Sequence, residues 1–294
     1  MSNIIEPEVY CIGETRKNED EIKRYLQDIG APNWAVNAPS EVEEIIEIEG
    51  RLCYLSFSND GTFLNSNISK VREGNDIYIK NIVDSKHGSV IEHGYANFIL
   101  RNISRVFTHE LARNDTGATL TGRPAISQES LRFVRLDNLN YWIPSCFKFK
   151  EAEFLFEEAF LHCEDSYQEL IMLAGFKENN IDLLPISKIF YPNVLKEGID
   201  LFNKLPFNKK KEYTSAARRI IPMGIATSMG WSCNLRALRN IIETRTESHA
   251  EEEIRLVFSK LGDIAIKRWP NLFSDYTTEE INGIKWFKTE NKKI

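Results

Sequence analysis

The sequence predicts an α/β protein that forms one domain with helical insertions. Several stretches have the apolar spacing of amphipathic helices, whereas residues 95–107 are rich in residues that favour strands. No repeat, low-complexity tract or clear linker divides the chain. Its 294 residues are 42% hydrophobic and 27% charged, the composition of a globular protein that buries a sizeable core.

The amino-terminal third contains three predicted helices. Residues 14–29 have the pattern of a charged amphipathic helix. Ser40 and Glu43 then form a Ser-x-x-Glu start signal for a helix over residues 40–55, because each side chain can satisfy a free backbone N–H of the first turn. A short helix is predicted over residues 77–85.

The central part alternates between strand and helix patterns. The strand-rich residues 95–107 are followed by a helical segment at 108–112. Further helices are predicted over residues 149–173 and 208–217, separated by a connection rich in proline and asparagine.

The densest group of polar donors lies on two predicted helices near the carboxyl end. The apolar stripe of the first, which contains Leu235 and Ile242, breaks near residues 244–249. Ser248 and Glu251 form a capping box for the second helix, so an irregular junction is expected between them. Such a junction can bind a ligand; the alternative is a surface helix pair whose arginines form ordinary ion pairs with nearby glutamates.

Composition excludes several functional classes. The five cysteines are scattered without a Cys-x-x-Cys pair, so neither a disulfide framework nor a zinc site is predicted. No apolar run is long enough to span a bilayer, which favours a cytoplasmic protein without a membrane partner. The net charge of −6 argues against broad nucleic-acid binding, although Arg218 and Arg219 could hold a small anion.

Two polar motifs are candidate ligand sites. His87 and His93 flank Glu92 at a spacing that does not match a helical zinc motif, so hydrogen bonding to a cofactor or plain helix capping is expected instead. An extended segment could aim Ser130 and Arg132 at one phosphate.

Arg218 follows a predicted helix. It is a second candidate for a phosphate, and the alternative is a surface arginine favoured by the helix dipole.

Taken in order, these motifs resemble those of the flavin-dependent thymidylate synthase family over residues 36–275. The matching segments are Gly50-Arg51-Leu-Cys-Tyr54, His87–His93, residues 103–113, Ser130-Leu-Arg132-Phe133, Ala217–Pro222, and Asn234-Leu-Arg236 with Asn240, Arg245, His249 and Glu253-Ile254. The resemblance implies a mainly antiparallel sheet flanked by helices. It leaves residues 1–35 as an amino-terminal extension and residues 276–294 as a tail.

The resemblance also implies a homotetramer that binds FAD, NADPH, methylenetetrahydrofolate and a pyrimidine nucleoside monophosphate. By position in the motifs, the FAD contacts are His87, Arg113, Asn240 and His249. The nucleotide contacts are Ser130, Arg132, Arg218 and Arg245, with Arg132 and Arg218 at the phosphate. Arg245 lies near the pyrimidine ring and is the catalytic candidate, since its charge would favour electron density on the ring.

The sequence departs from the family at the start of its signature. The family has Arg-His-Arg, whereas this chain has Arg113-Asn114-Asp115, followed by extra residues within 116–124. Glu110 and Gln128 also replace a glutamine and an acidic residue. Conversion of dUMP to dTMP is therefore the leading hypothesis. Methylation or hydroxymethylation of UMP or dCMP, and a noncatalytic nucleotide-binding homologue without flavin, are the alternatives.

Overall fold

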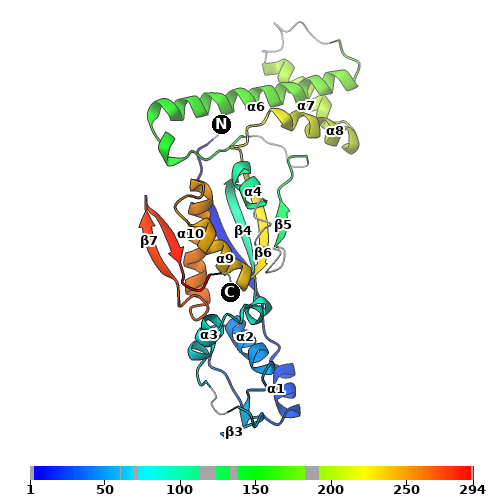
Figure 1. Cartoon of the computed structure of the whole chain (residues 1–294). Helices are drawn as coiled ribbons and strands as arrows, with labels where there is room; N and C mark the ends of the chain where they lie inside the picture. Colours follow the sequence, from blue (N-terminus) through cyan, green and yellow to red (C-terminus); the bar gives the residue numbers. More distant parts are fainter. Residues whose placement is uncertain are drawn as a thin grey trace. The chain divides into compact units, whose positions relative to one another are not determined.

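The computed structural model describes residues 3–59, 61–68, 72–112, 124–132, 138–182, 192–292 and 294. Its main sheet has four strands in the order β1-β4-β6-β5 (Figure 1). These strands are β1 (Glu8–Glu14), β4 (Tyr95–Ser104), β5 (Ala125–Gln128) and β6 (Ala226–Asn234).

The two inner strands run in opposite directions. Just after β4, the Arg105 N–H donates to the Ile225 carbonyl at 3.1 Å and the Val106 N–H to the Met223 carbonyl at 3.2 Å. The residue number of the acceptor falls as that of the donor rises, which is the pattern of two antiparallel chain segments. Helices alternate with these strands along the chain, and the predicted α/β class with a mainly antiparallel sheet is confirmed.

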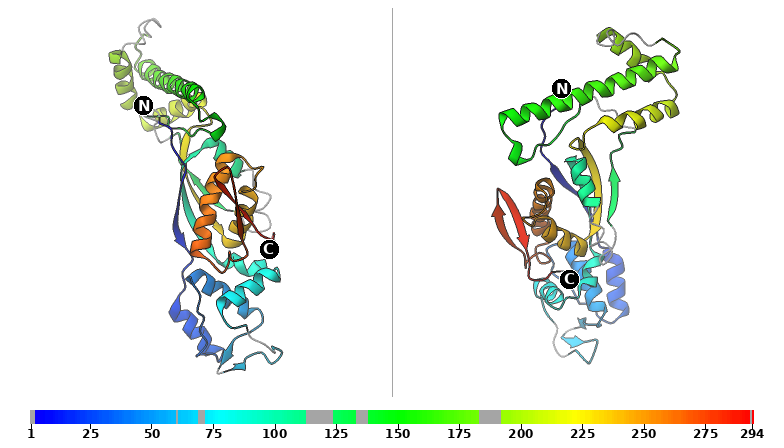
Figure 2. Two further views of the ribbon diagram at one scale, coloured as in Figure 1. Left: turned by 90° about the vertical axis from the view of Figure 1, so that its left-hand side faces the viewer. Right: turned by 45° about the horizontal axis from the view of Figure 1, so that its top comes forward.

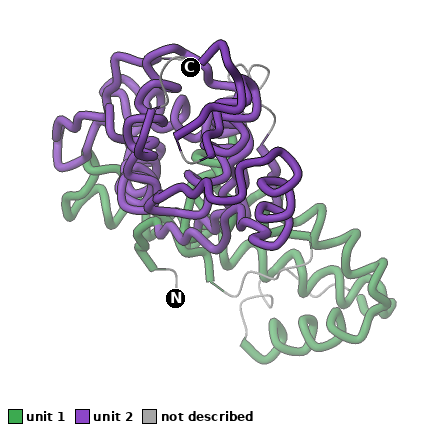
Figure 3. Tube along the Cα trace, turned by 90° about the horizontal axis from the view of Figure 1, so that it is seen from below, with its two compact units in different colours: residues 1–7, 101–109, 128–229 green, residues 8–100, 110–127, 230–294 purple. Residues whose placement is uncertain are grey.

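The chain divides into two compact units (Figure 3). Unit 1 comprises residues 1–7, 101–109 and 128–229, and unit 2 comprises residues 8–100, 110–127 and 230–294. Strands β4 and β6 contribute residues to both units.

Unit 1 is mostly helical, and α6 is its long green helix in Figure 2. Its helices are α6 (Lys150–Glu178), α7 (Pro192–Asn203), α8 (Phe207–Ala217), the start of α4 (Arg105–Ala112), and the short η2 (Ser145–Phe147) and η4 (Arg218–Ile220). Helices α6 and α7 approach closely at two glycines, since a Cβ on Gly175 would lie 2.0 Å from the Gly198 carbonyl oxygen. Helix α7 lies in the segment predicted to be a connection, so the sequence pattern missed this helix.

Unit 2 contains the remaining helices and two hairpins. They are α1 (Glu19–Asp28), α2 (Glu41–Leu52), β2 (Ser58–Asn59), β3 (Thr62–Phe63), α3 (Asn75–Asp84), η1 (Gly88–His93), α9 (Leu235–Arg245), α10 (Glu252–Arg268), β7 (Thr277–Ile281) and β8 (Ile284–Lys288). The fully buried Trp231 of β6 packs against Phe98 of β4 and Phe258 of α10, with ring centroids 5.7 and 5.8 Å away. This aromatic contact joins α10 to the sheet.

The predicted helix over residues 14–29 is wrong in its first turn. Strand β1 continues to Glu14, and the helix begins only at Glu19, where the Asn18 side chain accepts the Glu21 N–H at 3.3 Å. Pairing with a distant strand overrides the local helical pattern here. The Ser40 cap of α2 is confirmed, because its hydroxyl oxygen accepts the Glu43 N–H at 3.2 Å.

The junction between α9 and α10 is confirmed, but its predicted cap is not. Helix α9 ends at Arg245 and α10 begins at Glu252. The N-cap is Glu251, whose carboxylate accepts the Ile254 N–H at 3.1 Å, and Ser248 lies outside the helix in a turn. Glutamate can supply the same acceptor oxygen as the preferred shorter side chains.

Glu43 connects α2 to the segment that follows α10. Its fully buried carboxylate accepts the backbone N–H groups of Asn271 and Leu272 at 2.8 and 3.0 Å, and the Ser40 hydroxyl donates to it at 2.9 Å. Burial raises the pKa of Glu43 above its usual range, although these hydrogen bonds oppose the shift.

We expect Glu43→Gln to flatten the dependence of stability on pH. Because the folded state binds the Glu43 proton more tightly than the unfolded chain, its contribution is complete below about pH 4 and is lost as pH rises through the raised pKa. The free energy of unfolding, measured by urea denaturation between about pH 4 and 7, should fall less in the variant than in the wild type. The exposed Glu158→Gln is the control; an unchanged slope in Glu43→Gln would contradict the assignment.

Candidate functional site

His87 is the N-cap residue of η1 in unit 2. Its ring stacks on the exposed ring of Tyr54, with centroids 6.3 Å apart and planes inclined by 20°. The His87 side chain makes no cap hydrogen bond to η1, so plain helix capping is not its role. Two exposed rings held nearly parallel present flat surfaces that suit an aromatic ligand.

A cavity of about 260 Å³ lies beside this ring pair. Its described lining includes Arg51, Arg72, Tyr78 and Asn81 as well as both rings, and contains no carboxylate. In a chain of net charge −6, a polar cavity without acidic residues favours an anionic or neutral ligand over a cation.

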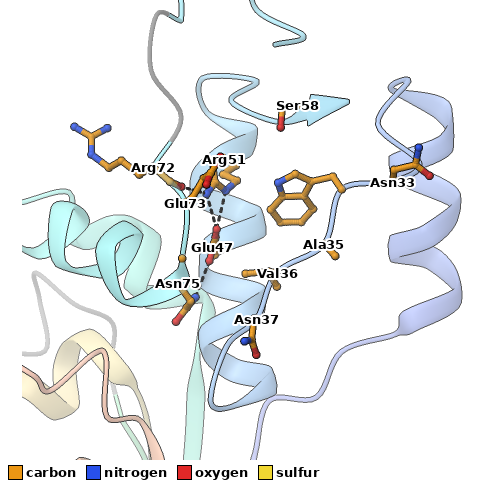
Figure 4. A pocket seen from close by; sticks show the side chains of 12 residues that line it. Asn33, Ala35, Val36, Asn37, Glu47, Arg51, Ser58, Arg72, Glu73 and Asn75 are labelled. Carbon is orange, nitrogen blue, oxygen red and sulfur yellow. Dashed lines mark hydrogen bonds and ion pairs between the residues drawn. The ribbon is translucent and has the colours of Figure 1, made fainter. Parts of the chain in front are cut away.

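A second cavity, of about 420 Å³, lies close to the first and is drawn in Figure 4. Glu47 occupies its wall and accepts from Arg51 Nε at 2.8 Å and from Asn75 Nδ2 at 2.8 Å. The remaining Arg51 donors bind the carbonyls of Ser56 and Arg72. These charges neutralise one another, and the hydrogen bond from Asn75 to Glu47 links α3 to α2.

Helix α9 presents two polar side chains one turn apart, near η1. Arg236 forms an ion pair with Glu92 and donates to the Ile294 carbonyl. The Asn240 side-chain oxygen is buried without a hydrogen-bond partner among the described residues. A buried amide oxygen of this kind is costly unless a donor reaches it, so Asn240 fits the polar edge of a heterocyclic cofactor.

The junction after α9 holds the other candidates of unit 2. Arg245 is the last residue of the helix and donates from Nη2 to the Glu110 carbonyl at 3.4 Å. His249 is exposed in the turn before α10. Burial, followed by the negative charges of Glu252 and Glu110, raises the pKa of Glu251. The junction therefore gathers both cationic and acidic side chains.

The ordinary ion-pair alternative holds for part of α9. Arg239 pairs with Asp275 and Arg236 with Glu92, whereas Glu243 pairs with Lys292. Arg236 and Arg239 therefore form ion pairs, but their partners lie far away in the sequence and not among the glutamates next to α9.

Unit 1 holds the predicted phosphate residues. The chain turns after β5 instead of continuing extended, because Leu131 and Arg132 lie in a turn and the Ser130 hydroxyl oxygen accepts the Arg132 N–H at 3.4 Å. The Arg132 carbonyl accepts the Thr214 hydroxyl of α8 at 3.0 Å. Arg218 caps the carboxyl end of α8, as predicted.

The sequence motifs do not identify Arg105 as a candidate site residue. It opens α4, and its Nη2 donates to the Glu129 carbonyl at 3.1 Å, one residue before Ser130. Burial lowers the pKa of Arg105, and the positive charge of Arg218 adds to this effect. Only the juxtaposition of α4 and η4 in the fold brings these two cations close.

The predicted FAD residue Arg113 and the departures Asn114 and Asp115 lie outside the described residues. Among the residues that are described, no cluster of three or more His, Cys, Asp or Glu side chains could hold a metal ion. Within the same part of the chain, no helix has the length and apolar character needed to cross a membrane.

Comparison with known proteins gives a consistent result. The model of the family described as thymidylate synthase complementing protein matches residues 36–271. The flavin-dependent thymidylate synthase of Corynebacterium diphtheriae is 27% identical, with 85% of each chain covered. That of Mycobacteroides abscessus is also 27% identical, with 83% of each chain covered.

A solved structure shares the fold. It is the UMP/dUMP methylase PolB from Streptomyces cacaoi bound with 5-Br UMP, with a TM-score of 0.56 and 14% identity. The match covers 92% of this chain and 95% of that one.

The polar face of α9 depends on a buried ion pair, and we expect its loss to be costly. Asp275 binds both terminal nitrogens of Arg239 at 2.9 and 2.8 Å, and the Arg239 side chain is only 2% exposed. Asp275→Ala leaves that charge without its partner and should lower the free energy of unfolding by roughly 3–5 kcal/mol in urea denaturation.

Asp263→Ala is the matched control, since it breaks the half-exposed pair with Lys285 and should change stability by less than about 1 kcal/mol. Equal effects of the two substitutions would mean that the Arg239 pair does not hold α9.

Proposed function

Because the chain belongs to the flavin-dependent thymidylate synthase family, we propose that it methylates carbon 5 of a pyrimidine nucleoside monophosphate, with dUMP as the leading substrate. The observation that carries the proposal is the family match over residues 36–271, which spans the candidate residues of both units. Family membership makes the chain an enzyme of the methyltransferase class, and the names of its relatives support flavin as the cofactor.

In this proposal, FAD is held by His87, Arg113, Asn240 and His249. Bound flavin supplies the reducing equivalents that convert the transferred one-carbon unit into a methyl group. The stacked ring of His87 offers a flat contact, and the buried oxygen of Asn240 offers an acceptor. Both features support a heterocyclic cofactor in unit 2. NADPH and methylenetetrahydrofolate are the proposed source of electrons and the one-carbon donor.

The nucleotide is held by Ser130, Arg132, Arg218 and Arg245. Arg132 and Arg218 neutralise the phosphate, because guanidinium groups match the geometry and charge of phosphate oxygens. Arg245 stabilises negative charge that develops on the pyrimidine ring. The proposed assembly is a homotetramer whose active sites take residues from several subunits.

UMP is the second candidate substrate. PolB is described as a UMP/dUMP methylase, so the fold accommodates both sugars in that protein. The family's acidic residue is replaced by Gln128, which here donates to the Thr108 hydroxyl at 3.2 Å. A changed hydrogen-bonding residue beside Ser130 is the kind of difference that alters nucleotide choice.

The substrate is tested by incubating the protein with FAD, NADPH and methylenetetrahydrofolate and with dUMP, UMP or dCMP in turn. We expect methylation, seen as a net mass gain of one CH2, on dUMP first and on UMP second. A hydroxymethyl product on dCMP would replace the leading substrate. Absence of any product, with nucleotide binding retained, would support the noncatalytic alternative.

We expect Asn240→Ala to weaken FAD binding about tenfold or more, because the variant loses the acceptor aimed at the cofactor. FAD fluorescence quenching measures the Kd. Asn67→Ala, at an exposed position of the same unit, is the control and should leave the Kd unchanged. Equal affinity of Asn240→Ala and wild type would remove Asn240 from the cofactor site.

We expect Arg245→Ala to reduce kcat by roughly 10²–10³-fold while the protein still binds FAD. The loss reflects missing stabilisation of charge on the ring, and steady-state turnover measures it. Arg245→Lys keeps the charge and should recover part of the rate. If the alanine variant turns over at the wild-type rate, Arg245 has no part in the reaction.

A further inference from the structure

The guanidinium of Arg105 in unit 1 has an unused hydrogen-bond donor. Its Nε is buried and has no hydrogen-bond partner among the described residues, whereas Nη2 donates to the Glu129 carbonyl at 3.1 Å. Leaving a charged donor buried and unsatisfied is unfavourable, so such a group in a native protein requires an explanation. An acceptor supplied by a ligand provides one.

The charges around Arg105 are unbalanced. The positive charge of Arg218, on η4, repels that of Arg105. Among the described carboxylates, the one that attracts the Arg105 charge is Glu129, on the segment after β5. The opposing effect of Arg218 is larger than the favourable effect of Glu129. The charges of Arg105 and Arg218 therefore lack full compensation, and a doubly charged anion bound near both would offset their repulsion.

The position of Arg105 connects it to the proposed phosphate residues. The carbonyl that it binds belongs to Glu129, which directly precedes Ser130. Arg105 also fixes the start of α4 through its backbone N–H, which donates to the Ile225 carbonyl at 3.1 Å. Its side chain therefore extends from an anchored helix terminus to the segment that carries Ser130 and Arg132.

We propose that Arg105 binds the phosphate of the nucleotide together with Arg218, and so makes the site select a nucleoside monophosphate over the free nucleoside. The inference rests on the proposed function and adds to it a phosphate-binding residue that lies outside the motifs assigned to the nucleotide. The phosphate is the favoured anion because a dianion balances the charges of Arg105 and Arg218 better than a single carboxylate of folate does.

The test compares a nucleotide with its nucleoside in three variants. Calorimetry measures the Kd of dUMP and UMP, and competition against the nucleotide measures the Kd of deoxyuridine and uridine. Arg105→Gln should raise the Kd of the nucleotides about tenfold to a hundredfold and leave the Kd of the nucleosides unchanged. Arg105→Lys retains a cation and should recover part of the affinity.

Arg219→Gln is the matched control. Arg219 adjoins Arg218 in the sequence, is exposed, and donates to the Ser215 carbonyl of α8 at 3.0 Å. Its removal should not change the affinity for any of the four ligands.

Three results would overturn the inference. Equal weakening of nucleotide and nucleoside by Arg105→Gln would indicate a structural role, and an unchanged nucleotide Kd would exclude the phosphate contact. A raised KM for methylenetetrahydrofolate with an unchanged nucleotide Kd would assign Arg105 to the folate carboxylates. Failure of the wild type to bind any nucleotide would instead refute the proposed function itself. Should Arg105→Gln fail to fold by circular dichroism, the nucleotide-to-nucleoside ratio of Arg105→Lys decides between these outcomes.

Discussion

The buried guanidinium of Arg239 is the constraint on which the arrangement of unit 2 depends. A charge that is only 2% exposed must be neutralised within the protein, and Asp275 does so with two hydrogen bonds. The Tyr276 ring also lies 4.8 Å from the Arg239 guanidinium, and its hydroxyl donates to the Arg239 carbonyl. Burial alone would raise the pKa of Asp275, but the hydrogen bonds and charge of Arg239, together with hydrogen bonds from Thr289 and Asn291, outweigh burial and lower it. The pair thereby fixes α9 against the segment before β7, and with it the positions of Arg236 and Asn240.

The two groups of candidate residues differ in chemistry. In unit 2 the described candidates include a buried amide oxygen at Asn240 and a stacked ring at His87, beside the guanidinium of Arg245. In unit 1 they are mainly cationic, with Arg105 and Arg218 repelling each other. A neutral heterocycle suits the first group and a phosphate the second. These are the two kinds of chemistry that a flavoenzyme acting on a nucleotide requires.

Local sequence signals predicted much of the fold. The cap at Ser40, the strand pattern that became β4 and the break between α9 and α10 all depend on neighbouring residues, and all are present in the structure. Strand β1 was missed because its stability comes from pairing with β4, far away in the sequence. Arg105 was missed for a similar reason, since its environment is created by Glu129 and Arg218. The family resemblance, in contrast, came from short motifs whose order the sequence displays directly.

The flavoprotein assignment is tested most directly by the absorbance spectrum of the purified protein, alone and after addition of FAD, with the released cofactor identified. Membership in the flavin-dependent family predicts the visible bands of a bound flavin, and release of FAD on denaturation. A spectrum without these bands, even when FAD is supplied in excess, would contradict the assignment. It would indicate instead that the change from Arg-His-Arg to Arg113-Asn114-Asp115 has abolished cofactor binding.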